Sequence, residues 1–415
     1  MLSWFKAQKV KDAKVLVVGA GALGNEVLKN LALFGIGNIV IVDFDKIEYS
    51  NLTRSVLFRT EDADKKSYKA VVAAQRIKEL NPKIRALPIN DKLETGVGLG
   101  LYRRMDAIIG CLDNLQSRIL LNRLCYRAGK TWIDGAIGDL EGQVSVYQPG
   151  TSCYECNLTD EEKSDFDKRI SCTGVVKINE NAGRVATTPV SASIIAAVQM
   201  QEAMKLIHQE DALKPPAPID KGFNPLANSQ FSYPPLLEGA ERIFTTLAGK
   251  LFVYEGMHPA FDVYDFANFD NNCTAHENWS PVIEILELSA DTKIHQALQI
   301  IKTRLGVEQV EINLRNNKFV EKISSRITNI NFTPMLPESK IPDYINQSKE
   351  LSDIQANEGF YQNSFENINK DFQYLYFTLK QTGIPYFDVI QVSTENGIFY
   401  IELSKDKDKY ERFFA

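Results

Sequence analysis

A glycine-rich turn between a short apolar segment and an amphipathic one constrains the fold of this chain more than any other feature. Residues 14–18 read KVLVV, and the GAGALG that follows contains Gly19, Gly21 and Gly24. Apolar residues then recur at helical spacing over residues 25–34. A strand, a tight glycine turn and a helix in this order begin the βαβ units of parallel sheets, and the turn offers backbone N–H groups to phosphate oxygens. We therefore expect a doubly wound, mostly parallel Rossmann-like α/β sheet with a nucleotide at this turn.

The alternation of strand and helix patterns continues as far as residue 134. The predicted strands cover 38–42, 83–88, 105–111 and 131–134, and the predicted helices cover 64–80 and 118–128. In open parallel sheets, ligands bind at the carboxyl ends of the strands. Asp43 and Asp113 each follow such an end, as does the glycine turn, so we expect one pocket to collect them.

The length of 415 residues predicts more than one domain. We expect a nucleotide-binding domain over 1–280 and a small α+β domain over 281–415, with a β-α-β unit over 282–314 and a hairpin formed by 386–392 and 397–403. The net charge of −6 argues against a nucleic-acid partner. We find no apolar run of membrane-spanning length and no signal-peptide pattern, and six cysteines indicate thiols or metal ligands rather than disulfides. We expect a cytoplasmic location.

Polar residues cluster just after the second predicted strand. Asp43 lies about twenty residues beyond the glycine turn, where a carboxylate can accept hydrogen bonds from ribose hydroxyls. Asp45 and Asn51 add polar groups close by. The alternative for Asp43 is a side chain that caps the loop after the strand.

Two basic residues and one acidic residue suit a triphosphate and its metal ion. Arg54 and Lys69 could neutralise phosphates, and Asp113, with Asn114 beside it, could hold magnesium through an oxygen. The alternatives are a solvated helix face for Lys69 and an ordinary turn residue for Asp113.

A C-x-x-C pair, Cys153 and Cys156, has the spacing of half of a tetrahedral zinc site. One sequence candidate fits the other half, the C-x-x-H of Cys273 and His276. Four such ligands would form a closed structural zinc site. A redox C-x-x-C and two unrelated pairs are the alternatives.

Cys172 is a candidate nucleophile. A reactive thiol needs exposure and a nearby cation, and Lys168 and Arg169 precede it in a strongly charged stretch. The alternative is a buried cysteine that packs as a small apolar side chain, an interpretation that suits Cys111 and Cys125 better.

Several segments together resemble a known family. DFDKIEYSNLTRSVLF, KSYKAVVAAQRI, CLDNLQSRILLN and DGAIGDLEGQV are similar to the activating enzymes of ubiquitin-like proteins. That ThiF/MoeB-like superfamily includes the adenylyltransferases of molybdopterin and thiamine sulfur carriers, and the resemblance covers residues 10–210. It implies that ATP is bound by the following residues: Gly19, Gly21, Gly24, Asp43, Asp45, Asn51, Arg54, Lys69, Asp113 and Asn114. It also implies a magnesium ion at Asp113 and a catalytic Cys172 on a crossover loop over 157–183.

The function implied by this resemblance is adenylation of the C-terminus of a ubiquitin-like protein. Thioester formation on Cys172 and transfer to a conjugating enzyme would follow, with the C-terminal domain resembling the ubiquitin-like fold that recruits such enzymes. The alternative for this domain is a structural or dimer-forming appendage. A homodimer is expected, and the compact chain is similar to prokaryotic members, including those of antiviral operons. The alternatives are a sulfur-carrier adenylyltransferase without a thioester, an NAD-dependent dehydrogenase and an inactive binding scaffold.

Overall fold

A computed structural model describes residues 5–159, 162, 187–208, 246–258, 260–266, 269–314, 367–372 and 375–414. Cys172 and nearly all of the predicted crossover loop after Thr159 lie outside these residues. Within the described residues, no helix has the length and apolar character needed to cross a membrane.

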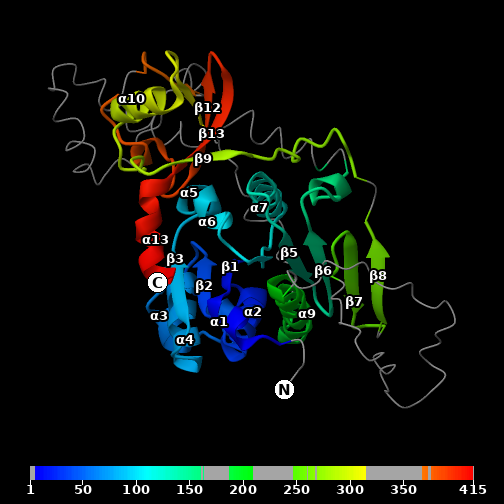
Figure 1. Ribbon diagram of the computed structural model, residues 1–415. Helices are drawn as coiled ribbons and strands as arrows, with labels where there is room; N and C mark the ends of the chain where they lie inside the picture. Colours follow the sequence, from blue (N-terminus) through cyan, green and yellow to red (C-terminus); the bar gives the residue numbers. More distant parts are fainter. Residues whose placement is uncertain are drawn as a thin grey trace, which may run out of the picture.

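An eight-stranded sheet forms the centre of the molecule (Figure 1). Its strand order is β3-β2-β1-β4-β5-β6-β7-β8; the first five strands are parallel and the last three pair antiparallel. The bounds are β1 Lys14–Val18, β2 Asn38–Val42, β3 Arg85–Ile89, β4 Ala107–Gly110, β5 Trp132–Ile137, β6 Glu141–Tyr147, β7 Lys250–Glu255 and β8 Ala260–Asp265. The expected doubly wound, mostly parallel sheet is therefore confirmed.

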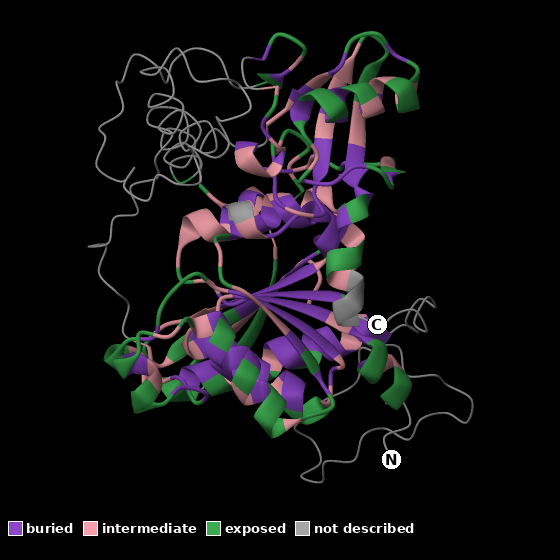
Figure 2. Ribbon diagram, turned by 90° about the vertical axis from the view of Figure 1, so that its left-hand side faces the viewer, coloured by how far each residue is buried: buried purple, intermediate pink, exposed green. Residues whose placement is uncertain are grey.

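Helices cover both faces of this sheet, as the view in Figure 2 shows. One layer contains α1 Ala7–Asp12, α2 Ala22–Phe34, α4 Lys69–Leu80 and α9 Pro189–His208. The opposite layer contains α5 Leu93–Gly96, α6 Leu99–Tyr102 and α7 Leu115–Arg127. Each layer closes its own apolar core against the sheet, because the central strands β1 and β2 bury side chains on both faces. Short helices α3 Thr60–Asp64, η1 Tyr49–Asn51 and η2 Glu155–Asn157 complete this part.

The predicted helix over 64–80 begins five residues too early, because the chain leaves the helical conformation between α3 and α4, and α4 starts at Lys69. Lys66 has a positive φ of 48°. The chain then pairs back onto the segment after β2: the Ile47 amide donates to the Ser67 carbonyl at 2.8 Å, and the Lys69 amide donates to the Asp45 carbonyl at 2.9 Å. These bonds satisfy backbone groups outside the helix and place Lys69 opposite Asp45.

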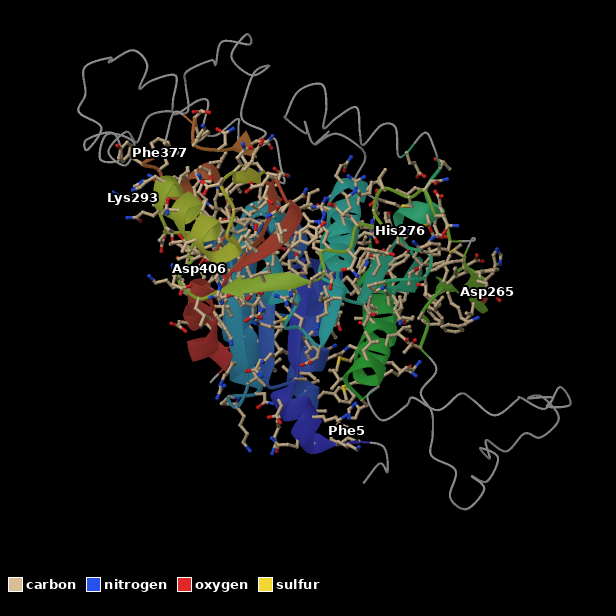
Figure 3. The ribbon with its side chains drawn as sticks, turned by 45° about the horizontal axis from the view of Figure 1, so that its top comes forward. Phe5, Asp265, His276, Lys293, Phe377 and Asp406 are labelled. Carbon is tan, nitrogen blue, oxygen red and sulfur yellow. The ribbon has the colours of Figure 1, made fainter. Side chains whose placement is uncertain are left out.

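A second sheet of five strands follows residue 281 and has order β11-β10-β12-β13-β9. Its elements are β9 Val282–Ile285, α10 Ile294–Leu305, β10 Glu311–Asn313, β11 Asn367–Ile368, η7 Lys380–Thr382, β12 Val389–Thr394, β13 Gly397–Leu403, η8 Ser404–Asp406 and α13 Lys407–Phe414. The sheet and α10 enclose a separate core that includes Ile294, Ile301 and Ile401. Figure 3 labels Asp406, which lies at the junction between β13 and α13. Phe387 and Val389 of this unit also pack into the core beside α5–α7, so the boundary after residue 280 stays a proposal.

A buried ion cluster joins the second unit to the layer of α5–α7. Glu402 on β13 is fully buried, and Arg104 approaches its two carboxylate oxygens with two N–H groups at 2.8 Å each. Arg103 donates to the same carboxylate. The Phe387 carbonyl accepts a hydrogen bond from the Gly100 amide at 2.9 Å, and the Arg104 guanidinium lies over the Phe387 ring. The contact therefore combines paired charge with apolar packing.

Replacing Glu402 by alanine should reduce the free energy of unfolding by about 2 kcal/mol, because two guanidinium groups lose their buried carboxylate. Glu284, which is 46% exposed and contacts the same arginines, provides the matched control. Glu284→Ala should cost under about 1 kcal/mol, since exposed ion pairs contribute little. Urea unfolding of both variants measures the difference, and equal losses would contradict the assignment.

Candidate nucleotide site and metal centre

The glycine turn after β1 is tightly packed on one side and open on the other. Gly19 has a φ of +96°, and a Cβ there would lie 2.3 Å from the Cys111 carbonyl oxygen. A Cβ on Gly24 would lie 2.1 Å from the Gly19 carbonyl oxygen. A Cβ on Gly21, the N-cap of α2, would meet nothing within 4 Å. The turn therefore excludes side chains where it packs and leaves space at the N-terminus of α2, where an anion is favoured.

Asp43 links the glycine turn to the end of β2 through hydrogen bonds. Its two carboxylate oxygens accept hydrogen bonds from the Ala20 amide at 2.7 Å and from the Asp45 amide at 2.8 Å. Burial raises the pKa of the Asp43 carboxyl, whereas Lys69 and these two N–H groups oppose the shift. The side chain thus caps the loop, as the alternative interpretation held, and it also lies beside the open space at the turn.

Lys69 begins α4 and turns back toward the same strand end. Its Nζ lies 2.8 Å from Oδ2 of Asp45, and its side chain is only 12% exposed. The side chain is therefore not part of a solvated helix face. Asn51 accepts a hydrogen bond from the Glu48 amide at 3.0 Å within η1, and Arg54 follows that turn. Among the residues that the structure describes, no side-chain hydrogen bond or ion pair holds the half-buried Arg54.

Asp113 is exposed just after β4, at the same edge of the sheet. Asn114 donates to its Oδ1 at 3.0 Å and also accepts from the Ser117 amide at 2.8 Å as the N-cap of α7. Asp113 is therefore oriented by the start of a helix while its carboxylate remains accessible to solvent. The carboxyl edge of the sheet thus presents carboxylate and ammonium groups around the glycine turn.

The four predicted zinc ligands converge. The ligand atoms of Cys153, Cys156, Cys273 and His276 all lie within 4.8 Å of one another. The Cys153 sulfur lies 3.7 Å from that of Cys156 and 3.8 Å from that of Cys273, and the Cys156 sulfur lies 3.3 Å from Nε2 of His276. A tetrahedron with Zn–S bonds of about 2.3 Å has sulfur–sulfur edges of about 3.8 Å, so the spacing fits zinc.

Two aromatic rings, from residues that the sequence analysis missed, hold the imidazole of His276. Tyr126 on α7 stacks at 4.7 Å between ring centroids, and Phe269 stacks at 4.3 Å on the imidazole. Burial lowers the pKa of His276 and raises the pKa of the Cys153 and Cys273 thiols. A neutral imidazole is ready to bind metal, whereas the thiols need a cation to become thiolates. Figure 3 labels His276 in the segment between β8 and β9.

Purified protein should contain about one zinc ion per chain, because all four donors suit a closed site. Cys153→Ser and Cys273→Ser should lose the metal and lower the melting temperature, since structural zinc contributes folding free energy. Mass spectrometry for metals and calorimetry measure both effects. Cys125→Ser, a buried cysteine outside the cluster, is the control and should retain zinc. Full metal content in His276→Ala would remove His276 from the ligand set.

Comparisons with known proteins agree with this arrangement. The family model described as "ThiF family" matches residues 5–238. The SUMO-activating enzyme subunit uba-2 of Caenorhabditis elegans is 40% identical over 159 residues, which cover 38% of this chain and 27% of that protein. The sulfur carrier protein adenylyltransferase of Thermus thermophilus is 37% identical over 155 residues, covering 36% of this chain and 56% of that protein.

Both matches therefore span less than two thirds of the relative's length. A crystal structure of E. coli MccB with succinimide aligns with 65% of this chain and 68% of its own, with a TM-score of 0.46 and 23% identity. That likeness is too low to support a conclusion. The family model, in contrast, covers more than half of the sequence and contains the glycine turn, Asp43, Lys69, Asp113 and the C-x-x-C. The chain belongs to the ThiF family.

Proposed function

We propose that this protein is an activating enzyme that uses ATP to adenylate the C-terminus of a ubiquitin-like protein. The substrate carboxylate attacks the α-phosphate, the bond to the β-phosphate breaks, and an acyl adenylate and pyrophosphate form. The observation that supports this proposal is the arrangement at the sheet edge. An open glycine turn, the Asp43 loop with Lys69, and the accessible Asp113 follow the carboxyl ends of the neighbouring parallel strands β1, β2 and β4 in a chain of the ThiF family.

Each residue has a role in this proposal. The turn and the N-terminus of α2 bind phosphate oxygens, Asp43 orients the ribose, and Asn51 and Arg54 face the triphosphate. Lys69 breaks its ion pair with Asp45, or keeps it in part, and stabilises the charge that develops on the phosphates. Asp113 and Asn114 would hold a magnesium ion, which screens phosphate charge when it is bound. Catalysis of this kind relies mainly on position and electrostatics.

In the second proposed step, the thiolate of Cys172 attacks the acyl carbonyl and AMP departs. The resulting thioester then passes to the cysteine of a conjugating enzyme, which the C-terminal unit would recruit. Cys172 lies outside the described residues, so its motif alone supports this step. A homodimer, a zinc ion in the Cys/His cluster and a cytoplasmic location belong to the same proposal.

A second candidate is a sulfur-carrier adenylyltransferase, which the name of the Thermus thermophilus relative favours. It would use the same nucleotide residues and pass its adenylate to a sulfur donor without a thioester on this chain.

The test is ATP–pyrophosphate exchange by the full chain with a ubiquitin-like protein that the immobilised chain retains from lysate in the presence of ATP. Exchange should require the intact C-terminus of that protein and cease when its last residue is removed. The same reaction followed by denaturing electrophoresis separates the two candidates, because only the activating enzyme accumulates a thioester. If no pyrophosphate exchange occurs and the absorbance of added NADH changes, the protein would instead be a dehydrogenase.

A further inference from the structure

Helix α7 begins at the proposed magnesium ligand and fixes its backbone. Asn114 caps the helix directly after Asp113, and one turn later Arg118 returns to the same loop. The Arg118 guanidinium donates to the Leu112 carbonyl at 2.6 Å and to Asp134 at 3.2 Å. Asp134 is buried at 3% exposure, so this pairing is costly to break. The side chain of Arg118 therefore fixes the loop that carries Asp113.

The middle of the same helix holds the segment between the first two metal ligands. The Tyr154 amide donates to the Asn122 side chain at 3.2 Å. Asn122 in turn donates to Glu155 at 3.2 Å, and Arg123 approaches the same carboxylate at 2.7 Å. Glu155 and Asn122 are 3% and 1% exposed. The C-x-x-C segment is therefore attached to α7 by buried polar contacts. Because each buried polar group needs its partner, the segment has few other positions available relative to the helix.

The end of α7 contacts the other half of the metal cluster. Tyr126 stacks on His276, and Arg127 pairs with Glu277 at 2.8 Å. Over its 13 residues the helix extends about 20 Å and contacts both halves of the cluster as well as the Asp113 loop.

Tyr154 closes the connection between the two sites. It stands between Cys153 and Cys156 in the sequence, packs edge-on against Tyr147 and lies beside the partly buried Arg118. The phenol of Tyr154 and the charged guanidinium of Arg118 interact electrostatically. One residue of the metal-binding segment consequently touches the side chain that fixes the Asp113 loop.

We propose that α7 couples the metal cluster to the nucleotide site, with Arg118 as the positioning residue and Tyr154 as its link to the cluster. The inference rests on the proposed ATP site. Metal held in the cluster fixes Tyr154 and α7, which fix Arg118 and so the position of Asp113. Because such coupling is reciprocal, ATP with magnesium also alters the geometry of the metal cluster.

The experiment measures the ligand geometry of the metal cluster and not the enzymatic activity. The full chain is loaded with Co²⁺, whose visible absorption reports the ligand geometry of a tetrahedral thiolate site. ATP and magnesium are titrated while absorption is recorded, and calorimetry measures ATP binding separately. We expect the cobalt band of the wild-type protein to shift and to saturate together with the heat of ATP binding.

Two variants and one control locate the connection. Tyr154→Phe keeps both cysteine ligands and the ring, so it should bind cobalt and ATP but lose most of the shift. Arg118→Lys keeps the charge but not the guanidinium geometry, so it should weaken ATP binding about fivefold or more and also lose the shift. Tyr264→Phe, on the exposed strand β8, should behave as wild type.

The outcomes separate this inference from the proposed function. A wild-type protein that binds ATP without any change in the cobalt band overturns the coupling and leaves the ATP site standing. A full shift in Tyr154→Phe overturns the route through Tyr154 and Arg118. No heat of ATP binding in the wild-type protein removes the proposed function, and with it this inference.

Discussion

Replacing Lys69 or Asp113 by alanine should slow ATP–pyrophosphate exchange by about 10²–10³-fold, the usual cost of removing one preorganised charge contact to a transition state. Lys69 is already directed at the strand end by its pairing with Asp45. Asp113 is oriented by Asn114 and remains exposed to a ligand. Neither change should unfold the protein, because Asp45 is 49% exposed and exposed pairs contribute under about 1 kcal/mol.

Lys78→Ala is the matched control, since Lys78 is an exposed lysine in the last turn of the same helix α4. It should exchange at the wild-type rate. Initial rates at saturating ubiquitin-like protein and varied ATP separate binding from chemistry. A Lys69→Ala or Asp113→Ala protein with near-normal exchange would refute the assignment of that residue.

The parallel part of the sheet could be predicted because its strands are buried on both faces and therefore read as short apolar runs. β1 and β2 have the predicted bounds, and β13 likewise matches its predicted range. β6 was missed because its sequence, EGQVSVY, mixes polar and apolar residues and contains a glycine. The break before Lys69 was also missed, since it arises from pairing with a segment distant in the sequence and not from local propensity.

In the candidate sites, the residues that bind could be predicted from the sequence, whereas the residues that orient them could not. The ligand pairs around Cys153 and Cys273 have a spacing that metal chemistry prescribes, and the structure brings them together. The partners that orient them carry no such pattern. Phe269, Asp134 and Glu155 look like ordinary loop or strand residues until the fold places them beside a ligand or a partly buried arginine. Motifs therefore identify the groups that bind, whereas the residues that position those groups are identified by the tertiary structure.

Cys172→Ala should retain pyrophosphate exchange with the captured ubiquitin-like protein and form no thiol-sensitive adduct. The two steps separate because adenylation depends on positioning and electrostatics, whereas the adduct requires a thiolate nucleophile. Non-reducing electrophoresis with and without added thiol measures the adduct, and isotope exchange measures the first step. Loss of both would indicate that the substitution disturbs the nucleotide site itself.

Cys125→Ala and Cys111→Ala are the controls, because burial raises the pKa of both thiols and leaves them protonated at neutral pH. Both variants should form the adduct, with small losses in stability from packing. Cys125 is the cleaner control, since the backbone of Cys111 packs against the glycine turn. An adduct that persists in Cys172→Ala would assign the thioester to another cysteine. A wild-type protein that exchanges pyrophosphate but never forms an adduct would make the sulfur-carrier adenylyltransferase the better account.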